Sequence, residues 1–441
     1  MKNQVKRNFN YERSRKLSYL NWKNINLLKQ VKEKIEDNSL NKESREHLEK
    51  LRKNISGCAF YSLYNKNSDV KYIGSHTCNH RGCNICNSQR QKRIRRKYFH
   101  FFTTTPELIK ARTKSGYKVY TQNYFNELIK KKPDIKFISK VNYDLMHLTL
   151  TVKHSKQGFN GNKYYFEEIL KTFHKLRNSN LKTDYNGMLY NWRSLVYGGE
   201  FGIETTKNEN GLHIHIHALL FVRKIKQNRN ILHKHILKSW NKYTVNKDFN
   251  KRDFTENEIK SIMKGNSILT DDFIKTFDRR GATLIGLENI FYYSKNGKKI
   301  RPKDLTDLKA VQRAVLETIS YHFKPDLFET DKETYNIDLI CEILPKIYKK
   351  QLYGKFGCLY NEKSLGLSSE NLLEDFAESR ELTETESSEG DFFIVQPAKV
   401  YHIDNQIILR KDLQKNKLRA NTTTSAISLM NAYYLQSIKG K

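Results

Sequence analysis

The chain has 441 residues, and 80 Lys and Arg residues against 47 Asp and Glu residues give it a formal net charge of +33. So large a basic excess favours a polyanionic partner such as nucleic acid, because cationic side chains displace the counterions condensed on phosphates. The codon bias of a Lys- and Asn-rich genome is the alternative explanation. Aromatic residues make up 12% of the chain, which disfavours a disordered basic tail and supplies rings on which unpaired bases can stack.

The distribution of apolar residues and cysteines predicts a soluble protein in a reducing compartment. No stretch approaches the roughly eighteen apolar residues that a membrane helix needs, and the N-terminus lacks the apolar core of a secretory signal. The six cysteines do not form the pattern of a disulfide framework, because three of them lie within nine residues. We therefore expect a cytoplasmic protein without a membrane partner.

The N-terminal part of the chain divides by composition. Residues 1–57 are predicted to form a basic helical region, because apolar residues recur at helical spacing in NLLKQVKEKIED. Residues 58–100 are rich in Cys, His, Asn, Gly and Arg, which indicates a small zinc-binding module that ends in a basic helix. From about residue 140 strand-like and helix-like patterns alternate, and we assign residues 101–360 to one domain.

Three closely spaced cysteines predict a zinc site. Cys78, Cys83 and Cys86 follow the spacing C-x4-C-x2-C, and its C-x2-C half has the geometry that tetrahedral zinc favours. A structural site needs a fourth ligand, which we expect to be Cys58, with His76 and His80 as local competitors; ordinary buried cysteines are the alternative. A zinc-pinned turn that leads into a basic helix suits DNA binding, and the expected contacts are Arg90, Arg93, Arg95 and Arg96.

The central domain alternates strand and helix patterns in chain order. Residues 147–152, HLTLTV, alternate like a half-buried strand, and residues 164–178 have the period of an amphipathic helix. LVYGGEFGIETT and HIHIHALLFV are predicted strands on either side of the Gly-bearing turn KNENG, which favours an antiparallel pair. Residues 307–324 form a strong helical pattern that Pro325 ends.

The second of these strands places His213, His215 and His217 on one face, because successive side chains of a strand point to opposite faces. Neighbours two residues apart lie about 7 Å apart, but the outer two histidines lie about 13–14 Å apart. One ion can therefore bind His213 with His215, or His215 with His217. Glu204 lies across the hairpin as a further ligand, and a carboxylate with two imidazoles suits Mn²⁺ or Mg²⁺. An exposed His-rich face without an ion is the alternative.

The helix over residues 307–324 carries a second chemical signal. Glu317 and Tyr321 are four residues apart and share one helix face, and Lys324 lies a further turn along the same side. A tyrosine can attack a phosphorus centre when the phosphate is polarised and its charge is neutralised. Tyr321 is therefore the candidate nucleophile, Lys324 the charge-balancing cation, and Glu317 the group that activates water or deprotonates a nucleophile.

The C-terminal part begins with a segment rich in Glu, Ser and Thr, in which Arg380 is the single basic residue between Glu370 and Asp391. This composition predicts a solvated linker over residues 361–395. Residues 396–441 are a C-terminal extension in which VYHIDNQIILRKDL is typical of a hairpin that turns at Asp404 and Asn405.

Together these motifs resemble the replication-initiator (Rep) proteins of rolling-circle plasmids, within the HUH endonuclease superfamily. The family pattern G-x-H-P-H-x-H-x-L-L is matched by residues 211–220, with Ile214 in place of proline, and its paired metal histidines fall on His215 and His217. The family's first motif, F-L-T-L-T-V, is similar to residues 147–152, and its third, E-x-x-x-Y-x-x-K-x-D, to residues 317–326. The cysteine cluster followed by basic residues looks like the family's zinc-binding region.

The resemblance implies an α+β fold with a central antiparallel sheet backed by helices, an N-terminal zinc-binding module and a C-terminal extension. It implies nicking and joining of single-stranded or hairpin DNA at a plasmid origin, with a divalent metal (Mn²⁺ or Mg²⁺) and a structural Zn²⁺. Tyr321 would stay joined to the 5′ phosphate and leave a 3′-OH for a polymerase, and water activated by Glu317 would end the cycle. A host helicase and polymerase are the expected partners.

Three other functions are compatible with the sequence. A transposase or mobilisation relaxase would use the same chemistry at the same residues. A non-catalytic zinc-containing DNA-binding protein would use the cysteines and the basic helix, with a structural histidine strand. A metal-dependent hydrolase of small substrates would leave the net charge of +33 unexplained.

Overall fold

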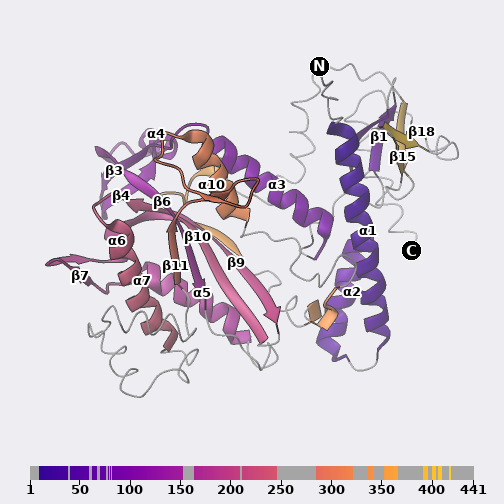
Figure 1. Cartoon of the computed structure of the whole chain (residues 1–441), viewed down its shortest axis with the longest axis horizontal. Coiled ribbons are helices and arrows are strands. Elements are labelled where there is room, and N and C mark those ends of the chain that lie inside the picture. Colours follow the sequence, from indigo (N-terminus) through magenta and orange to yellow (C-terminus); the bar gives the residue numbers. More distant parts are fainter. Residues whose placement is uncertain are drawn as a thin grey trace. The chain divides into compact units, whose positions relative to one another are not determined.

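The computed structural model of the chain divides into two compact units (Figure 1). One comprises residues 1–90, 328–345 and 367–441, and the other residues 91–327 and 346–366. The structure describes residues 9–37, 40–58, 62–66, 70–75, 78, 80, 82–151, 163–208, 211–245, 285–320, 335–338, 340–341, 352–365, 391–395, 400–403, 406–409 and 417–418. In the described part, no helix combines the length and the apolar character required to span a membrane.

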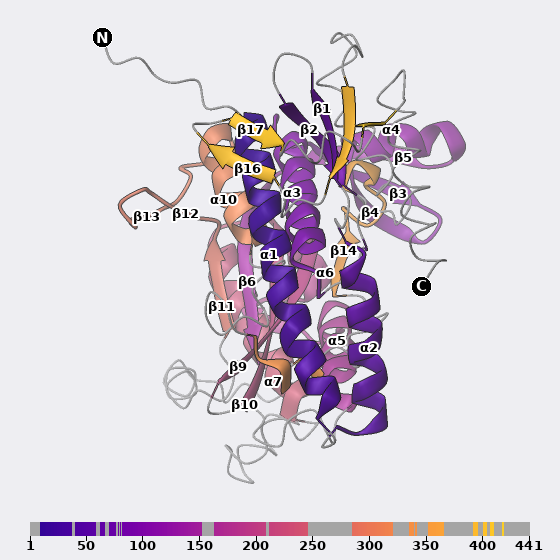
Figure 2. The ribbon, with the colours of Figure 1, turned by 90° about the vertical axis from the view of Figure 1, so that its right-hand side faces the viewer.

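Two helices occupy most of the N-terminal region: α1 (Phe9–Glu36) and α2 (Lys42–Ser56) lie side by side (Figure 2). Their contact is apolar, because Leu27 and Val31 of α1 and Leu48 and Leu51 of α2 are buried at helical spacing. The helix α2 begins after Asn41, whose side chain accepts a hydrogen bond from the backbone N–H of Ser44. Cys58 lies two residues after the end of this helix, beyond the capping residue Gly57.

The same unit contains an antiparallel sheet with the strand order β18-β15-β1-β2. Its strands are β1 (Ser62–Lys66), β2 (Val70–Ser75), β15 (Asp391–Val395) and β18 (Lys417–Leu418). The strand β15 lies within the segment predicted as an acidic linker, and Lys363–Leu365 at its other end form a short 3-10 helix. Both ends of the predicted linker, residues 361–395, therefore contain regular structure. At the C-terminal end the apolar run of residues 392–395 pairs with β1 in the sheet.

The C-terminal hairpin has the predicted strands. β16 (Val400–Ile403) and β17 (Gln406–Leu409) pair antiparallel, with Ile403 opposite Gln406. Asp404 and Asn405, the predicted turn, lie outside the described residues.

The second unit is built around a five-stranded antiparallel sheet with the strand order β11-β6-β10-β9-β14 (Figure 1). Its strands are β6 (Tyr143–Thr151), β9 (Val196–Asn208), β10 (Gly211–Arg223), β11 (Ile285–Asn289) and β14 (Tyr353–Gly357). The predicted α+β fold with a central antiparallel sheet backed by helices is confirmed. The histidine strand β10 is the middle strand, between β6 and β9.

One face of this sheet is apolar because alternate residues of β10, among them Ile214, Ile216 and Leu220, point away from the histidines and are buried. The helices α5 (Lys163–Arg177), α6 (Trp192–Leu195) and α7 (Asn228–Val245) lie on this side (Figure 1). The ring of Phe173 on α5 packs 5.2 Å from that of Phe201 on β9. The indole Nε1 of Trp240 on α7 donates a 3.1 Å hydrogen bond to the backbone oxygen of Thr151.

The opposite face carries the histidines and is partly covered by α3 (Asn84–Phe101) and α10 (Leu308–Ser320). Phe102, directly after α3, stacks on Phe221 of β10 with 6.2 Å between ring centroids. The hydroxyls of Tyr98 on α3 and Tyr353 on β14 lie 3.3 Å apart, and α10 packs against β10. Residues 84–90 of α3 belong to the first unit and the rest of this helix to the second.

A smaller sheet, with the order β4-β3-β5, has no counterpart in the sequence predictions. Its strands are β3 (Leu108–Thr113), β4 (Gly116–Thr121) and β5 (Lys136–Val141), and α4 (Gln122–Lys131) follows β4. Phe125 of α4 packs with Ile109 and Ala111 of β3 in a small core. Two short hairpins are also described in this unit: β7 (Thr183–Tyr185) pairs with β8 (Met188–Tyr190), and β12 (Tyr292–Tyr293) pairs with β13 (Lys299–Ile300).

A buried histidine on α7 makes the stability of the second unit depend on pH. His235 is fully buried between the hydroxyls of Thr183, 3.1 Å from Nδ1, and Ser239, 3.4 Å from Nε2. Burial, with a contribution from Lys238, lowers the pKa of His235 from 6.5 to about 4. The folded chain therefore keeps this imidazole neutral, whereas the unfolded chain protonates it below its ordinary pKa.

Because the folded pKa is the lower one, the stabilisation is complete above pH 6.5 and is lost as the pH falls toward about 4. The loss amounts to about 3 kcal/mol in the free energy of unfolding. The variant His235→Gln removes this titration, and its unfolding free energy should fall less steeply over that range in urea titrations. Exposed His100 is the matched control. A slope in His235→Gln as steep as in the wild type would contradict the assignment.

Candidate functional site

Four cysteines converge in the first unit. Cys58 follows α2, Cys78 and Cys83 flank a short loop, and Cys86 lies in the first turn of α3. Their sulfur atoms all lie within 4.8 Å of one another, with Cys58 to Cys83 at 3.3 Å and both Cys58 and Cys78 to Cys86 at 3.6 Å. Sulfur atoms around a tetrahedral zinc with bonds of about 2.3 Å are about 3.8 Å apart. The cluster therefore fits a metal ion such as zinc.

Hydrogen bonds from backbone N–H groups and from one side-chain amide favour thiolates at these positions. The backbone N–H of His80 donates to Cys78 Sγ at 3.4 Å, and that of Cys78 to Cys58 Sγ at 3.5 Å. The side-chain amide of Asn24, buried on α1, donates to Cys83 Sγ at 3.2 Å. Such donors stabilise the negative charge of metal-bound sulfur and fix its orientation.

The structure supports Cys58 as the fourth ligand over the local histidines. Nδ1 of His80 accepts a hydrogen bond from the backbone N–H of Gly82 at 3.0 Å, which holds this ring within the loop. His76 lies outside the described residues.

Replacement of a cluster cysteine tests the metal site. The variant Cys83→Ser is expected to lose the bound metal, because serine offers a hard, protonated oxygen in place of a soft thiolate. Elemental analysis of the purified protein should find about one zinc per wild-type chain and close to none in the variant, with a lower melting temperature. The control is Cys341→Ser, a half-buried cysteine of the same unit outside the cluster. Full zinc content in Cys83→Ser would exclude the site.

The basic run predicted to bind DNA lies on α3. Arg95 and Arg96 are exposed, whereas Arg90 and Arg93 are half-buried. Arg90 donates a 2.7 Å hydrogen bond to the side chain of Asn87. These exposures leave Arg95 and Arg96 the better placed for a phosphate, and the DNA contact stays a prediction.

The strand register places Glu204, His215 and His217 on the same face of the central sheet. His215 lies opposite Glu204 of β9 and Thr151 of β6, and His217 lies opposite Gly202 and Thr149. Glu204 reaches its diagonal neighbour, because its Oε2 lies 2.9 Å from His217 Nε2. The glycine opposite His217 presents no side chain that would block this approach.

His147 of β6 belongs to the same group, and the sequence analysis did not assign it to the site. Its Nε2 lies 3.3 Å from His217 Nδ1, the nitrogen that also lies 3.3 Å from the hydroxyl of Thr149. The rings of His147 and His217 stack with centroids 5.5 Å apart, and the ring of His215 stacks on His217 at 5.8 Å. The side chains of Glu204, His147 and His217 are largely buried. The sequence HLTLT could have indicated this position, because His147 lies two and four residues before the two threonines and therefore shares their face of the strand.

The chemistry of these donors fits a small divalent ion. Two adjacent ligands of an octahedral ion with bonds of about 2.1 Å are about 3.0 Å apart, close to the 2.9 Å between His217 Nε2 and Glu204 Oε2. His217 can present a lone pair at Nε2 because the Thr149 hydroxyl can accept a hydrogen bond from Nδ1–H. The same hydroxyl can donate when Nδ1 is unprotonated, and His217 then donates to Glu204 instead.

Within the described part of the chain, the ligand atoms of three or more residues meet around one point only at the four cysteines. Glu204, His217 and His147 instead form a hydrogen-bonded chain in which His217 uses both of its nitrogens. Binding of an ion by this group would thus require His215, or a small rotation of the His217 ring, to complete the ligand set.

Other predicted site residues fall partly outside the described region. Glu317 is described and half-buried on α10, the helix that packs against β10. Tyr321 and Lys324 lie outside the described residues, as does the side chain of His213. The described helix ends at Ser320, and Tyr321 is the next residue in the sequence.

A basic edge next to the histidine face was also not predicted. Glu288 of β11 lies opposite His147 in the register and accepts hydrogen bonds from Lys299 at 2.5 Å and Arg301 at 3.0 Å. Burial alone would raise the pKa of Glu288, but these two cations lower it. Lys299 also lies 3.8 Å above the ring of Phe291, which packs against His147.

The chain was compared with protein-family models, curated proteins and solved structures. No family model matches it, and neither a curated protein nor a solved structure is significantly similar.

Proposed function

We propose that this protein is a nicking endonuclease of the HUH type that acts at a plasmid origin and initiates rolling-circle replication. The observation that carries the proposal is the grouping of His215, His217 and Glu204 on one face of the middle strands of an antiparallel sheet. The neighbouring strand is β6, which contains the residues similar to the family's first motif. The net charge of +33 agrees with a DNA substrate.

In this proposal His215, His217 and Glu204 hold a Mn²⁺ or Mg²⁺ ion, which would polarise the scissile phosphate and stabilise the charge that develops on it. His147 and Thr149 act on the metal ligand His217. Their contacts with Nδ1 fix the orientation of the ring, as outer-shell partners of metal-bound histidines do. Lys299 and Arg301 add positive charge next to this face, and this charge would attract the phosphates of a bound DNA strand.

Tyr321 is the proposed nucleophile. Its phenolate oxygen attacks the phosphorus, the bond to the 3′ oxygen breaks, and the 5′ phosphate stays joined to the tyrosine. Lys324 balances charge at the phenolate, and Glu317 activates the water that later releases the protein. The packing of α10 against β10 supports this assignment, because Tyr321 directly follows the last described residue of that helix.

A host helicase and polymerase are the proposed partners after the nick, because the free 3′-OH is a primer on a duplex that must be unwound. A transposase or mobilisation relaxase with the same chemistry differs in its DNA: terminal repeats or a transfer origin would take the place of a replication origin. The non-catalytic alternative depends on the cysteine cluster and α3 alone.

The test is the detection of a covalent protein–DNA adduct. Single-stranded oligonucleotides that tile the DNA flanking the gene are incubated with the full-length protein and Mn²⁺, then separated on a denaturing gel. The proposal expects a protein band that carries labelled DNA, with mass spectrometry locating the attachment on Tyr321. Shifted bands on native gels without any adduct or nicked strand would favour the non-catalytic DNA-binding protein.

A further inference from the structure

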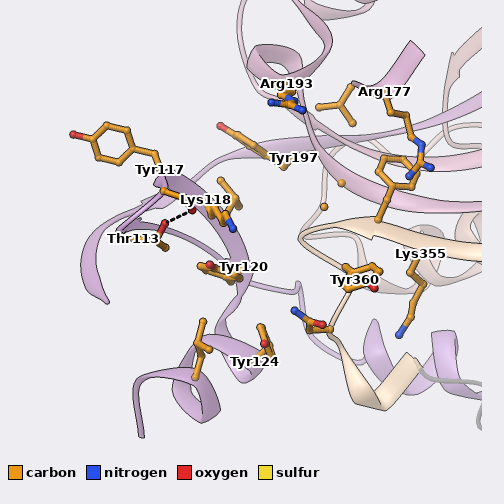
Figure 3. Close-up of a pocket in the computed structure, with 18 of the residues that line it drawn as sticks. Thr113, Tyr117, Lys118, Tyr120, Tyr124, Arg177, Arg193, Tyr197, Lys355 and Tyr360 are labelled. Carbon is orange, nitrogen blue, oxygen red and sulfur yellow. Dashed lines mark hydrogen bonds between the residues drawn. The ribbon is translucent and has the colours of Figure 1, made fainter. Parts of the chain in front are cut away.

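The second unit contains an open cavity of about 950 Å³ to which β10 contributes no residue. Its walls come from β4 and α4 on one side and from the end of α5, the start of β9 and the turn after β14 on the other (Figure 3). The volume lies within the range of protein cavities that bind small ligands. The cavity is thus distinct from the histidine group, and the function proposed above assigns no role to the residues that line it.

Aromatic rings line this cavity from both sides. Tyr120 and Tyr124 stand on one wall with ring centroids 5.9 Å apart, and Tyr360 faces them from the other wall (Figure 3). Tyr360 is 68% exposed, so that little of its ring is covered by protein. Tyr197 lines the cavity from the start of β9, and Tyr117 marks the outer end with its ring turned away from the others (Figure 3). Tyr117 and Tyr360 are exposed, and Tyr120, Tyr124 and Tyr197 are half-buried. Accessible rings of this kind are the platforms on which unpaired bases stack.

The charge of the lining is strongly positive. Among the described residues that line it, the single carboxylate belongs to Asp134, which forms an ion pair with Lys114 at 3.6 Å. Six lining residues are basic: Lys114, Lys118, Lys132, Arg177, Arg193 and Lys355. Such an excess of cations attracts an anionic ligand and opposes binding of a cationic or neutral apolar one.

Arg177 is a partly buried cation among these residues. Its guanidinium lies over the rings of Phe356 at 4.6 Å, Phe173 at 4.9 Å and Phe201 at 5.4 Å. Burial lowers the pKa of Arg177 to about 10, so that it stays protonated at neutral pH.

No carboxylate among the described residues forms an ion pair with Arg177, and its buried Nε has no hydrogen-bond partner. Its Nη2 donates to His174 at 3.3 Å. A desolvated cation without an anion is unfavourable by itself, which indicates that an external anion completes the site. Phosphate matches the planar donor array of arginine.

We propose that this cavity binds unpaired nucleotides of a single DNA strand. The tyrosines stack with the bases, and Arg177, Arg193 and Lys118 contact the phosphates. Rings and cations interleaved in one cavity fit a ligand that has both flat faces and regularly spaced negative charge. Paired bases offer no free faces, so that the site selects a single strand over a duplex. The assignment of the strand as DNA rests on the proposed function. The stacking and charge arguments are independent of that function.

The binding test uses the full-length protein without added divalent metal and a dye-labelled single-stranded DNA oligonucleotide, with fluorescence anisotropy as readout. The double variant Tyr120→Ala/Tyr360→Ala should raise Kd at least about tenfold, because each stacked base contributes about 1–3 kcal/mol. The variant Tyr120→Phe/Tyr360→Phe keeps both rings and should stay within about twofold of the wild type. The matched control is Tyr293→Ala, a 50% exposed tyrosine outside the cavity.

The charge argument has its own measurement. Lys118→Gln/Arg193→Gln should make the dependence of log Kd on log salt shallower, by about 0.7 for each lost contact to a single-strand phosphate. Both side chains are exposed, so that folding should be retained, which circular dichroism verifies. An unchanged salt dependence would remove these two residues from the site.

Competition experiments decide the ligand class. Unlabelled single-stranded DNA should displace the probe, whereas duplex DNA and dAMP should do so at least about tenfold more weakly. RNA of the same sequence that binds more tightly than DNA would overturn the assignment to DNA, and a wild-type Kd in Tyr120→Ala/Tyr360→Ala would overturn the site itself. Loss of binding in that variant without any adduct in the wild type would contradict the proposed function alone. Adduct formation with unchanged binding in the variant would contradict this inference alone.

Discussion

His217→Ala is expected to lower metal-dependent nicking by about 100-fold or more. A metal that polarises a phosphate contributes several kcal/mol to the transition state, and each 1.4 kcal/mol is about tenfold in rate. His217 contacts both the carboxylate of Glu204 and the ring of His147, so its removal would take away a proposed metal ligand and the contact that joins the other two side chains. The measurement is the rate of nicked-product formation at saturating Mn²⁺ on denaturing gels.

The control for this variant is His100→Ala, which removes an exposed imidazole on α3. Because His217 is 7% exposed, thermal unfolding must show that His217→Ala is folded before its rate is interpreted. Nicking by folded His217→Ala at the wild-type rate would eliminate the histidine group as the catalytic metal site. Equal wild-type rates with and without divalent metal would do the same.

Tyr321→Phe is expected to abolish the covalent protein–DNA adduct and to leave DNA binding within about twofold of the wild type. Phenylalanine retains the ring and lacks the oxygen that forms the phosphodiester with the strand. The adduct is measured on denaturing gels and binding by anisotropy, with the same oligonucleotide in both assays. Tyr293→Phe, at an exposed tyrosine of β12, is the matched control. An adduct of normal yield in Tyr321→Phe would place the nucleophile at another residue.

The elements with a strong local pattern could be predicted from the sequence. The alternation of histidine and isoleucine specifies β10, and the short Gly-bearing turn before it specifies its pairing with β9, so that Glu204 comes to lie beside the histidines. The four cysteines could likewise be grouped, because three of them are close in the chain and zinc requires a fourth ligand.

The features that depend on distant pairing could not be predicted. His147 joins His217 through the register of β6 with β10, across 70 residues of sequence. The strand β15 pairs with β1, which lies more than 300 residues earlier in the chain. Local composition contains no information on which distant strand a segment pairs with. The acidic residues before β15 led to the prediction of a linker that included its apolar residues.

Two glycines that line the tyrosine-lined cavity, Gly198 and Gly357, accept no larger residue. A Cβ on Gly198 would lie 2.4 Å from the backbone nitrogen of Cys358, and one on Gly357 would lie 2.3 Å from the backbone oxygen of Tyr197. Gly357 also has a φ of 59°, which other residues rarely adopt. A substitution at either glycine would therefore require the backbones of β9 and β14 to move apart. Related proteins that prefer other ligands would therefore be expected to differ in the tyrosines and lysines of the cavity and to keep both glycines.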